Sequence, residues 1–182
     1  MKTWLALLRG VNVGGANLLP MKQLAAAFEQ AGFRSVRTYI QSGNVIFRSG
    51  SGTPSTLQAR ISRLILKEFG LQPQVMVISG EELAAAVRDN PFPDAEKDHK
   101  SVHLYFLGEA PGNADLEPLA RLDTGREKFA LKGRVFYLHT PDGFPQSIVR
   151  SRIERCLRVA ATARNWRTAN ELLKMLDQSE DK

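Results

Sequence analysis

The hydrophobic and polar positions of the first half predict a strand, a helix, two strands, a helix, a strand and a helix. Residues 4–9 are apolar on both faces, which is typical of a central strand. Ser42-Gly43-Asn44 separates two runs rich in β-branched and aromatic residues, which predicts a hairpin turn. Pro20 is expected in the first turn of a helix, and Ser79 and Glu82 form a capping box. The expected elements are residues 4–9, 20–31, 36–41, 45–48, 57–69, 75–78 and 79–87.

The second half repeats the same order of elements. Gly43 and Gly133, each at a predicted hairpin, lie 90 residues apart, and the predicted capping residues Ser79 and Thr168 lie 89 apart. A β-α-β-β-α-β unit followed by a helix has the ferredoxin-like order. The sequence therefore predicts an α+β protein with two tandem ferredoxin-like subdomains and antiparallel sheets, residues 1–91 and 92–182. The expected elements of the second half are residues 102–107, 115–122, 128–131, 135–139, 149–157, 159–162 and a helix that starts at the capping box 168–171.

A glycine-rich loop after the first strand distinguishes the two halves. From Leu7 to Gly43 the chain advances 36 residues, whereas from Phe106 to Gly133 it advances only 27. The nine additional residues fall at this loop. Because loops on a rigid scaffold often carry function, the loop is the first candidate site. An inert insertion or a dimer contact is the alternative.

The residue types of this loop favour an anionic ligand. Gly10, Gly14 and Gly15 permit positive φ and close backbone approach, so their N–H groups can form an anion nest around Asn12. Arg9, at the entrance of the loop, is suited to a phosphate or carboxylate. The spacing is neither G-x-G-x-x-G nor a P-loop, so no particular nucleotide fold is indicated.

A second candidate lies before the last helix, at Arg164, Asn165 and Trp166. An indole beside guanidinium groups suits nucleic acid, with a base on the ring and phosphates on the arginines. The alternative is a tryptophan that anchors the final helix. Ser42 and Asn44 are not included in the site, because we expect the hairpin tip to lie at the opposite end of the sheet from the glycine-rich loop.

Composition and charge narrow the function classes. The chain has 182 residues, a net charge of +6 and one cysteine, Cys156, which excludes an intrachain disulfide. The basic balance favours anionic partners such as a small anionic ligand or nucleic acid, and for the arginines between residues 150 and 167 a solvated helix face is the alternative. No run is long and apolar enough for a membrane, and no cleavable signal is expected, so we predict a cytoplasmic protein without membrane contact.

Catalytic and metal-binding patterns are not evident. The three histidines lack metal-ligand spacing, so neither a metal nor a cofactor is expected. Cys156 belongs to an apolar helical stripe and is expected in the core. His139, Asp142 and Ser147 lie close in sequence, but no G-x-S-x-G elbow supports a triad. Whether the protein is an enzyme stays open at this point.

Four segments of the sequence form a specific combination of motifs, residues 7–15, 39–45, 141–143 and 161–168. Through these motifs the chain resembles a bacterial family known as domain of unknown function 1697. The resemblance implies paired ferredoxin-like subdomains and brings no established activity. The family usually has basic residues after the second turn, where Gln146 and Ile148 stand here, so an anion site at that place is expected to be weak or absent.

Three functional hypotheses follow. The first is a binding module for a small anionic ligand, nucleotide or nucleic acid, with the glycine-rich loop and Arg9 on the phosphate and Arg164 and Trp166 assisting. The second is an enzyme acting on a phosphorylated or acidic metabolite, which lacks a convincing general base. The third is a scaffold whose loop forms a protein contact.

Overall fold

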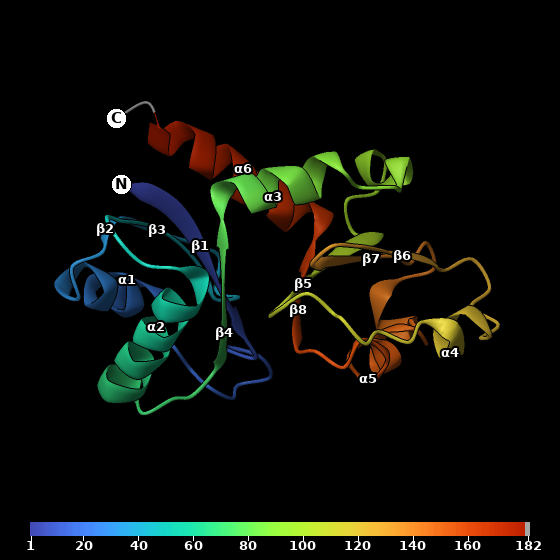
Figure 1. The fold of residues 1–182 in the computed structure, drawn as a ribbon, viewed down its shortest axis with the longest axis horizontal. Coiled ribbons are helices and arrows are strands. Elements are labelled where there is room, and N and C mark those ends of the chain that lie inside the picture. The colour runs from blue at the N-terminus through green and yellow to red at the C-terminus, as the bar shows by residue number, and fades with distance from the viewer. Residues whose placement is uncertain (181–182) are drawn as a thin grey trace. The chain divides into compact units, whose positions relative to one another are not determined.

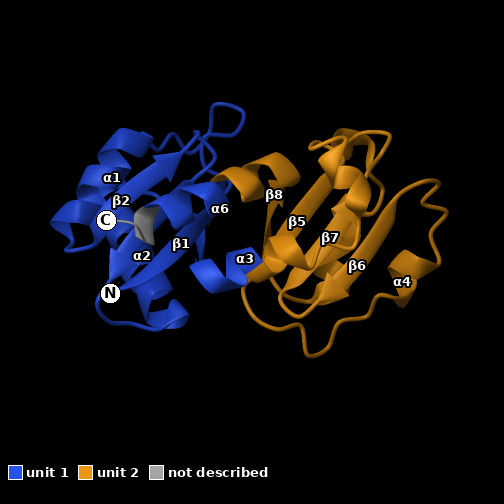
Figure 2. Cartoon of the chain, turned by 90° about the horizontal axis from the view of Figure 1, so that it is seen from above, with its two compact units in different colours: residues 1–84, 172–182 blue, residues 85–171 orange. Residues whose placement is uncertain are grey.

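The computed structural model describes residues 1–180 and divides into two compact units. Unit 1 comprises residues 1–84 and the C-terminal segment from Leu172, and unit 2 comprises residues 85–171 (Figure 2). Helix α3 (Gly80–Arg88) and helix α6 (Trp166–Glu180) each begin in one unit and end in the other. A domain boundary between residues 91 and 92 stays a prediction.

Unit 1 contains a four-stranded antiparallel sheet in the order β2-β3-β1-β4. This is the ferredoxin-like arrangement, with the first strand in the interior of the sheet. Helices α1 and α2 pack on one face of this sheet (Figure 1). The elements are β1 (Lys2–Arg9), α1 (Met21–Gln30), β2 (Arg34–Tyr39), β3 (Asn44–Ser49), α2 (Pro54–Phe69) and β4 (Gln74–Ser79).

The alternation of side chains along β1 explains the core of unit 1. Trp4, Ala6 and Leu8 point to the helical face and pack with Phe28 of α1 and Ile61 of α2. The residues between them on β1 are buried as well, which confirms the prediction of a strand that is apolar on both faces. Burial of this apolar surface is the main contribution to the stability of the unit.

Unit 2 repeats the topology, with the sheet order β6-β7-β5-β8. The two halves therefore confirm the predicted α+β fold of paired ferredoxin-like subdomains. The helical layer is thinner here, because short α-helices and 3-10 turns replace the long helices of unit 1. The elements are β5 (Val102–Leu107), α4 (Glu117–Ala120), β6 (Lys128–Lys132), β7 (Val135–His139), α5 (Ile153–Leu157) and β8 (Ala161–Asn165), with 3-10 turns at Pro93–Glu96, Phe144–Gln146 and Arg150–Arg152.

The start of the last helix differs from the prediction. The first capping box is confirmed, since Glu82 N donates to Ser79 Oγ (3.1 Å) and Ser79 N donates to Glu82 Oε2 (2.8 Å). In the second half, however, Asn165 is the cap, and its Oδ1 accepts from Thr168 N at 2.8 Å. The predicted capping box at residues 168–171 is therefore wrong, and the preceding strand ends three residues later than expected. Asparagine caps a helix as well as serine does, so both helices begin by the same device.

The hairpin tip of unit 1 lies beside the glycine-rich loop. Strand β3 runs antiparallel to β1, with Leu7 opposite Asn44, so the start of β3 meets the end of β1. Leu8 N donates to Gly43 O at 2.8 Å. The expectation that loop and tip lie at opposite ends of the sheet is wrong, because β1 and β3 are direct antiparallel neighbours in this fold.

Gly43 is required by this close approach. A Cβ at Gly43, whose φ is +74°, would lie 2.7 Å from Leu8 Cβ and 2.7 Å from Val11 Cγ2. Gly10 also has a positive φ, +69°, but a Cβ there would meet nothing within 4 Å. Gly43 is therefore required both by its backbone conformation and by the lack of space for a side chain, whereas Gly10 is favoured by its backbone conformation alone.

We predict that Gly43→Ala lowers the free energy of unfolding by about 3 kcal/mol, because overpacking adds to the cost of left-handed backbone. Gly10→Ala, the matched control, is expected to cost about 1 kcal/mol. Urea denaturation of both variants checks this. Equal losses in the two variants would contradict the close packing of the tip on β1.

Candidate functional site

Asn12 joins the glycine-rich loop to the hairpin tip. Its Nδ2 donates to Leu19 O (2.9 Å) in the loop and to Gln41 O (2.8 Å) in the tip. Its Oδ1 accepts from Leu19 N at 2.7 Å. One partly buried amide thus makes three hydrogen bonds, two of them at the end of the loop and one on a segment 29 residues away. We call this arrangement the Asn12 clamp.

Asn12 itself has a φ of +54°, in the left-handed region. Asparagine tolerates that region better than most residues, because its short side chain bonds to nearby backbone.

The centre of the loop is a tight turn over Val13-Gly14-Gly15-Ala16. Ala16 N donates to Val13 O at 3.0 Å, and φ is +57° at Gly14 and +79° at Gly15. Positive φ at both central residues is the requirement of a type I′ turn. Turn geometry therefore explains two of the glycines, and it leaves the N–H groups of Gly14 and Gly15 exposed, without a partner among residues 1–180.

The hairpin tip holds a strained residue. Ile40 has a φ of +47°, which is rare for a β-branched side chain and costs on the order of 1–3 kcal/mol. Asn44, which is fully buried, donates to Tyr39 O (3.1 Å) and to Ser42 Oγ (2.9 Å). Bonds from Asn12 and Asn44 thus bracket Ile40 on both sides and oppose its relaxation.

Exposed apolar side chains gather at this end of unit 1. Val13 is 65% exposed, Leu18 69% and Ile40 51%, although each lies beside a residue that is held in place by hydrogen bonds. Scattered single apolar residues on a surface need no explanation, but these three are sequence neighbours of Asn12, Leu19 and Gln41, which the Asn12 clamp joins, so they lie at the same end of the unit. We call Val13, Leu18 and Ile40, together with the exposed amides of Gly14 and Gly15, the tip surface.

Arg9 stands at the start of the loop, as predicted, and is exposed. Its Nη1 donates to Gln74 Oε1 at 3.3 Å, across the pairing of β1 with β4. The loop residues predicted as ligand-binding, Arg9, Gly10, Asn12, Gly14 and Gly15, therefore lie within one continuous segment. Gly10 is exposed and accepts a hydrogen bond at its carbonyl from Asn17 Nδ2 (3.0 Å), whereas Asn12 is occupied by the clamp.

The second predicted group has a different character. Trp166 is only 3% exposed, and its Nε1 donates to Glu96 Oε1 at 3.2 Å. Arg164 is 7% exposed and donates to Thr162 Oγ1 and Ala163 O. Burial lowers the pKa of the Arg164 guanidinium to about 10. The indole has no open face on which a base can stack, so the geometry fits the alternative in which Trp166 anchors the final helix.

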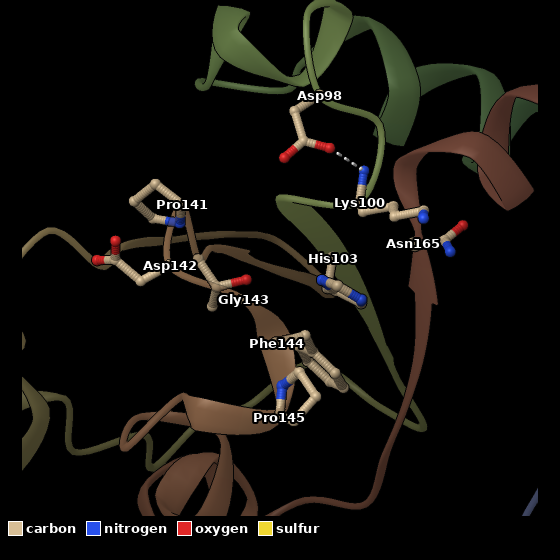
Figure 3. Close-up of a pocket in the computed structure, with 10 residues that line it drawn as sticks. Asp98, Lys100, His103, Pro141, Asp142, Gly143, Phe144, Pro145 and Asn165 are labelled. Atoms are coloured by element: carbon tan, nitrogen blue, oxygen red, sulfur yellow. Dashed lines mark hydrogen bonds between the residues drawn. The ribbon is translucent and has the colours of Figure 1, made fainter.

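A pocket in unit 2 was not predicted. It has a volume of about 510 Å³ and lies between the 100–103 segment, the turn after β7 and Asn165 at the end of β8 (Figure 3). The sequence indicated residues 141–143 as a turn and Asn165 as part of a separate candidate group, but it gave no reason to place them together. Gln146 and Ile148, on which the expectation of a weak anion site was based, do not line it. The lining residues are Asp98, Lys100, His103, Thr140, Pro141, Asp142, Gly143, Phe144, Pro145 and Asn165.

His103 forms the buried wall of this pocket. It is 8% exposed and stacks on Phe144, with ring centroids 3.7 Å apart and an interplanar angle of 15°. Burial, and secondly the charge of Arg150, lower the pKa of His103 to about 4. The imidazole is therefore neutral near pH 7. Its Nδ1 is enclosed and has no hydrogen-bond partner among the described residues.

The remaining candidate chemistry does not form a catalytic arrangement. Ser147 Oγ donates to Glu127 Oε2 (2.7 Å), and Asp142 forms an ion pair with Arg126, so neither acts on a histidine. Cys156 is buried, as expected. Across residues 1–180 there is no group of three His, Cys, Asp or Glu that can hold a metal ion. The same residues include no helix with the length and apolarity needed to cross a bilayer.

The two four-stranded sheets, each in the ferredoxin-like order, define the class of protein, an α+β protein built from two ferredoxin-like halves. The chain belongs to the family described as protein of unknown function (DUF1697), whose model matches residues 1–137. Among solved structures, the conserved bacterial protein SP0830 from Streptococcus pneumoniae matches with a TM-score of 0.69 and 21% identity, over 96% of this chain and 98% of that one. At that identity the likeness shows the fold alone. A search of curated proteins found no match.

The environment of His103 predicts a pH dependence of stability. Between pH 6.5 and about 4 the unfolded chain protonates this histidine and the folded chain does not, so stability falls as the pH is lowered through this window. The contribution is on the order of 3 kcal/mol. We expect the slope of unfolding free energy against pH to be shallower in His103→Phe, which keeps a ring on Phe144. Identical slopes in denaturation between pH 4 and 7 would contradict the assignment.

Proposed function

We propose that this protein is a binding module that receives an anionic ligand, a nucleotide or single-stranded nucleic acid, on the tip surface of unit 1. The observation that carries the proposal is the tight turn that leaves the N–H groups of Gly14 and Gly15 exposed and without a partner among residues 1–180, in the loop that begins after Arg9. Backbone N–H groups held in a tight turn are favourable partners for phosphate oxygens, because their orientation costs nothing further on binding.

The apolar residues of the tip surface favour a ligand that is larger than a single phosphate. A phosphate alone uses only the amides and a guanidinium. Val13, Leu18 and Ile40 are exposed next to these donors, and they offer apolar contact to a base or a sugar. Unstacked bases of single strands are accessible to such contacts, whereas those of a duplex are not.

The charge distribution supports an anionic ligand for this half of the chain. Residues 1–91 carry ten Lys and Arg against five Asp and Glu, whereas residues 92–182 carry fifteen against fourteen. A positive surface increases the rate of association with nucleic acid and makes the affinity fall with salt. An enzymatic role is not supported, because the described residues at the tip include no histidine, cysteine or carboxylate for acid–base or nucleophilic chemistry.

A protein contact is the second candidate function, and the apolar patch is the observation that favours it. Val13, Leu18 and Ile40 are half of the exposed large hydrophobic residues of the described chain. A patch of this kind on a rigid turn is also typical of a surface that meets another protein. The two candidates differ in salt dependence and in the effect of Arg9, which separates them experimentally.

We predict that the protein binds a fluorescent single-stranded oligonucleotide in low salt, and that Arg9→Gln weakens this binding by about tenfold through loss of one phosphate contact. Arg63→Gln is the matched control, since Arg63 is an exposed arginine on α2, away from the loop. Anisotropy titrations at several salt concentrations measure both.

A flat titration at every salt concentration would overturn the nucleic-acid proposal. A concentration-dependent increase in molecular mass, lost in Leu18→Ser and unaffected by Arg9→Gln, would instead establish the protein contact. Equal effects of the Arg9 and Arg63 substitutions would show that binding is governed by general charge and not by the loop.

A further inference from the structure

The pocket of unit 2 has no part in the proposed function, yet it has the features of a built site. All ten residues that line it belong to unit 2. Its volume, about 510 Å³, lies within the range of small-molecule sites. His103 is more than nine-tenths buried at its wall and has no hydrogen-bond partner among residues 1–180. The buried atom without a partner is Nδ1, whereas Nε2 is not enclosed, so the imidazole can form a hydrogen bond to a ligand through Nε2.

The different burial of the two ring nitrogens determines which nitrogen of His103 faces the pocket and whether it carries a proton. Nδ1 is enclosed without a donor or an acceptor, whereas Nε2 is not enclosed. A neutral imidazole carries one proton, and an enclosed lone pair is tolerated better than an enclosed N–H. The favoured tautomer therefore places the proton on Nε2, so His103 offers a hydrogen-bond donor to whatever occupies the pocket.

Asn165 offers a second donor for a related reason. Its Oδ1 accepts from Thr168 N at 2.8 Å and caps helix α6. Because the carbonyl is committed to the cap, the NH₂ group is the part of this amide that remains for a ligand. Lys100 adds a third donor at the rim, and in Figure 3 its side chain extends toward Asn165.

Both carboxylates of the lining already accept from donors of the chain. Asp142 forms a two-point ion pair with Arg126, and one of its contacts is 3.2 Å from Arg126 Nε to Asp142 Oδ2. Asp98 Oδ1 accepts from Lys100 N at 3.0 Å. Phe144, with a proline on either side of the turn, supplies the apolar part of the wall. A ligand that fits has an acceptor-rich group for the three donors and an apolar body.

From this geometry we infer that the unit 2 pocket binds a small carboxylic acid, with its carboxylate on His103 Nε2, Asn165 Nδ2 and Lys100 and its body against Phe144. A carboxylate suits the donors because its two oxygens accept several hydrogen bonds in one plane. The site is independent of the tip surface, so failure of the nucleic-acid proposal leaves it unaffected.

The test uses the full chain and a pair of probes of the same shape, benzoate and benzamide. Two-dimensional NMR of the ¹⁵N-labelled protein follows the backbone amides that surround the pocket. Benzoate is expected to shift the amides of residues 142–144 and 165 saturably, and benzamide to bind at least about tenfold more weakly. An absence of saturable shifts with benzoate at these residues would overturn the inference, as would equal affinity for the two probes.

Asn165→Asp is the decisive variant. An aspartate caps α6 as an asparagine does, but it replaces the NH₂ donor by a negative oxygen that repels the ligand. Benzoate binding is expected to weaken by at least about tenfold in this variant. Asn113→Asp, which adds the same charge at an exposed position outside the lining, is the matched control and is expected to bind as the wild type.

A second variant is available in case the substitution at Asn165 disturbs the cap of α6. If Asn165→Asp fails to fold, His103→Phe replaces it, since a phenyl ring keeps the stack on Phe144 and removes the N–H donor. Undiminished benzoate affinity in the folded variant would refute the donor set. A loss of affinity in Asn113→Asp of the same size would refute it too, because the effect would then come from net charge alone.

Discussion

The side chain of Asn12 is the interaction on which the candidate site of unit 1 depends. Val11 and Leu19 bury the two ends of the glycine-rich loop in the core of unit 1, but the residues between them are mostly exposed, and the entropy of ordering such a segment is large. The Asn12 amide adds three hydrogen bonds, at 2.7–2.9 Å, that close the loop on itself and attach it to the hairpin. The positive φ of Ile40 persists because the segment on either side of it is fixed in this way.

This constraint gives the two halves of the molecule different roles on the same topology. Both sheets place the first strand in the interior, next to the second strand of the hairpin, so both could carry a loop at the same edge. The expectation that the nine additional residues of the first half fall at the glycine-rich loop is wrong, because the connection after the first strand is of similar length in both units, residues 10–20 and 108–116. Most of the difference lies in α1, which is longer than α4, and in the longer hairpin tip of unit 1. In unit 2 polar groups collect around His103, where the turn after β7 meets the end of β8.

Much of the fold could be predicted from the sequence, because the strand and helix periodicity, the turn glycines and the internal repeat all indicated the same order of elements in two halves. The position of the hairpin tip was missed, although the antiparallel pairing of β1 with β3 follows from the ferredoxin-like order itself. The cap at Asn165 was missed because Thr168 and Glu171 match a capping pattern that only the register of β8 excludes. The pocket at His103 was beyond prediction, since its lining comes from three separate segments and a lone histidine in a strand carries no signal of its own.

Hydrogen exchange in Asn12→Asp tests whether the glycine-rich loop and the hairpin tip form one preorganised surface. Aspartate keeps the oxygen that accepts from Leu19 N but loses both donations, and it sets a negative charge against two carbonyl oxygens. We expect faster exchange at Leu8 N, whose acceptor is Gly43 O in the tip, as well as at Leu19 N in the loop, with the hairpin of β6 and β7 unchanged. Faster exchange confined to the loop, with Leu8 N as protected as in the wild type, would show that the tip holds its position without Asn12 and that the two segments are not one preorganised surface.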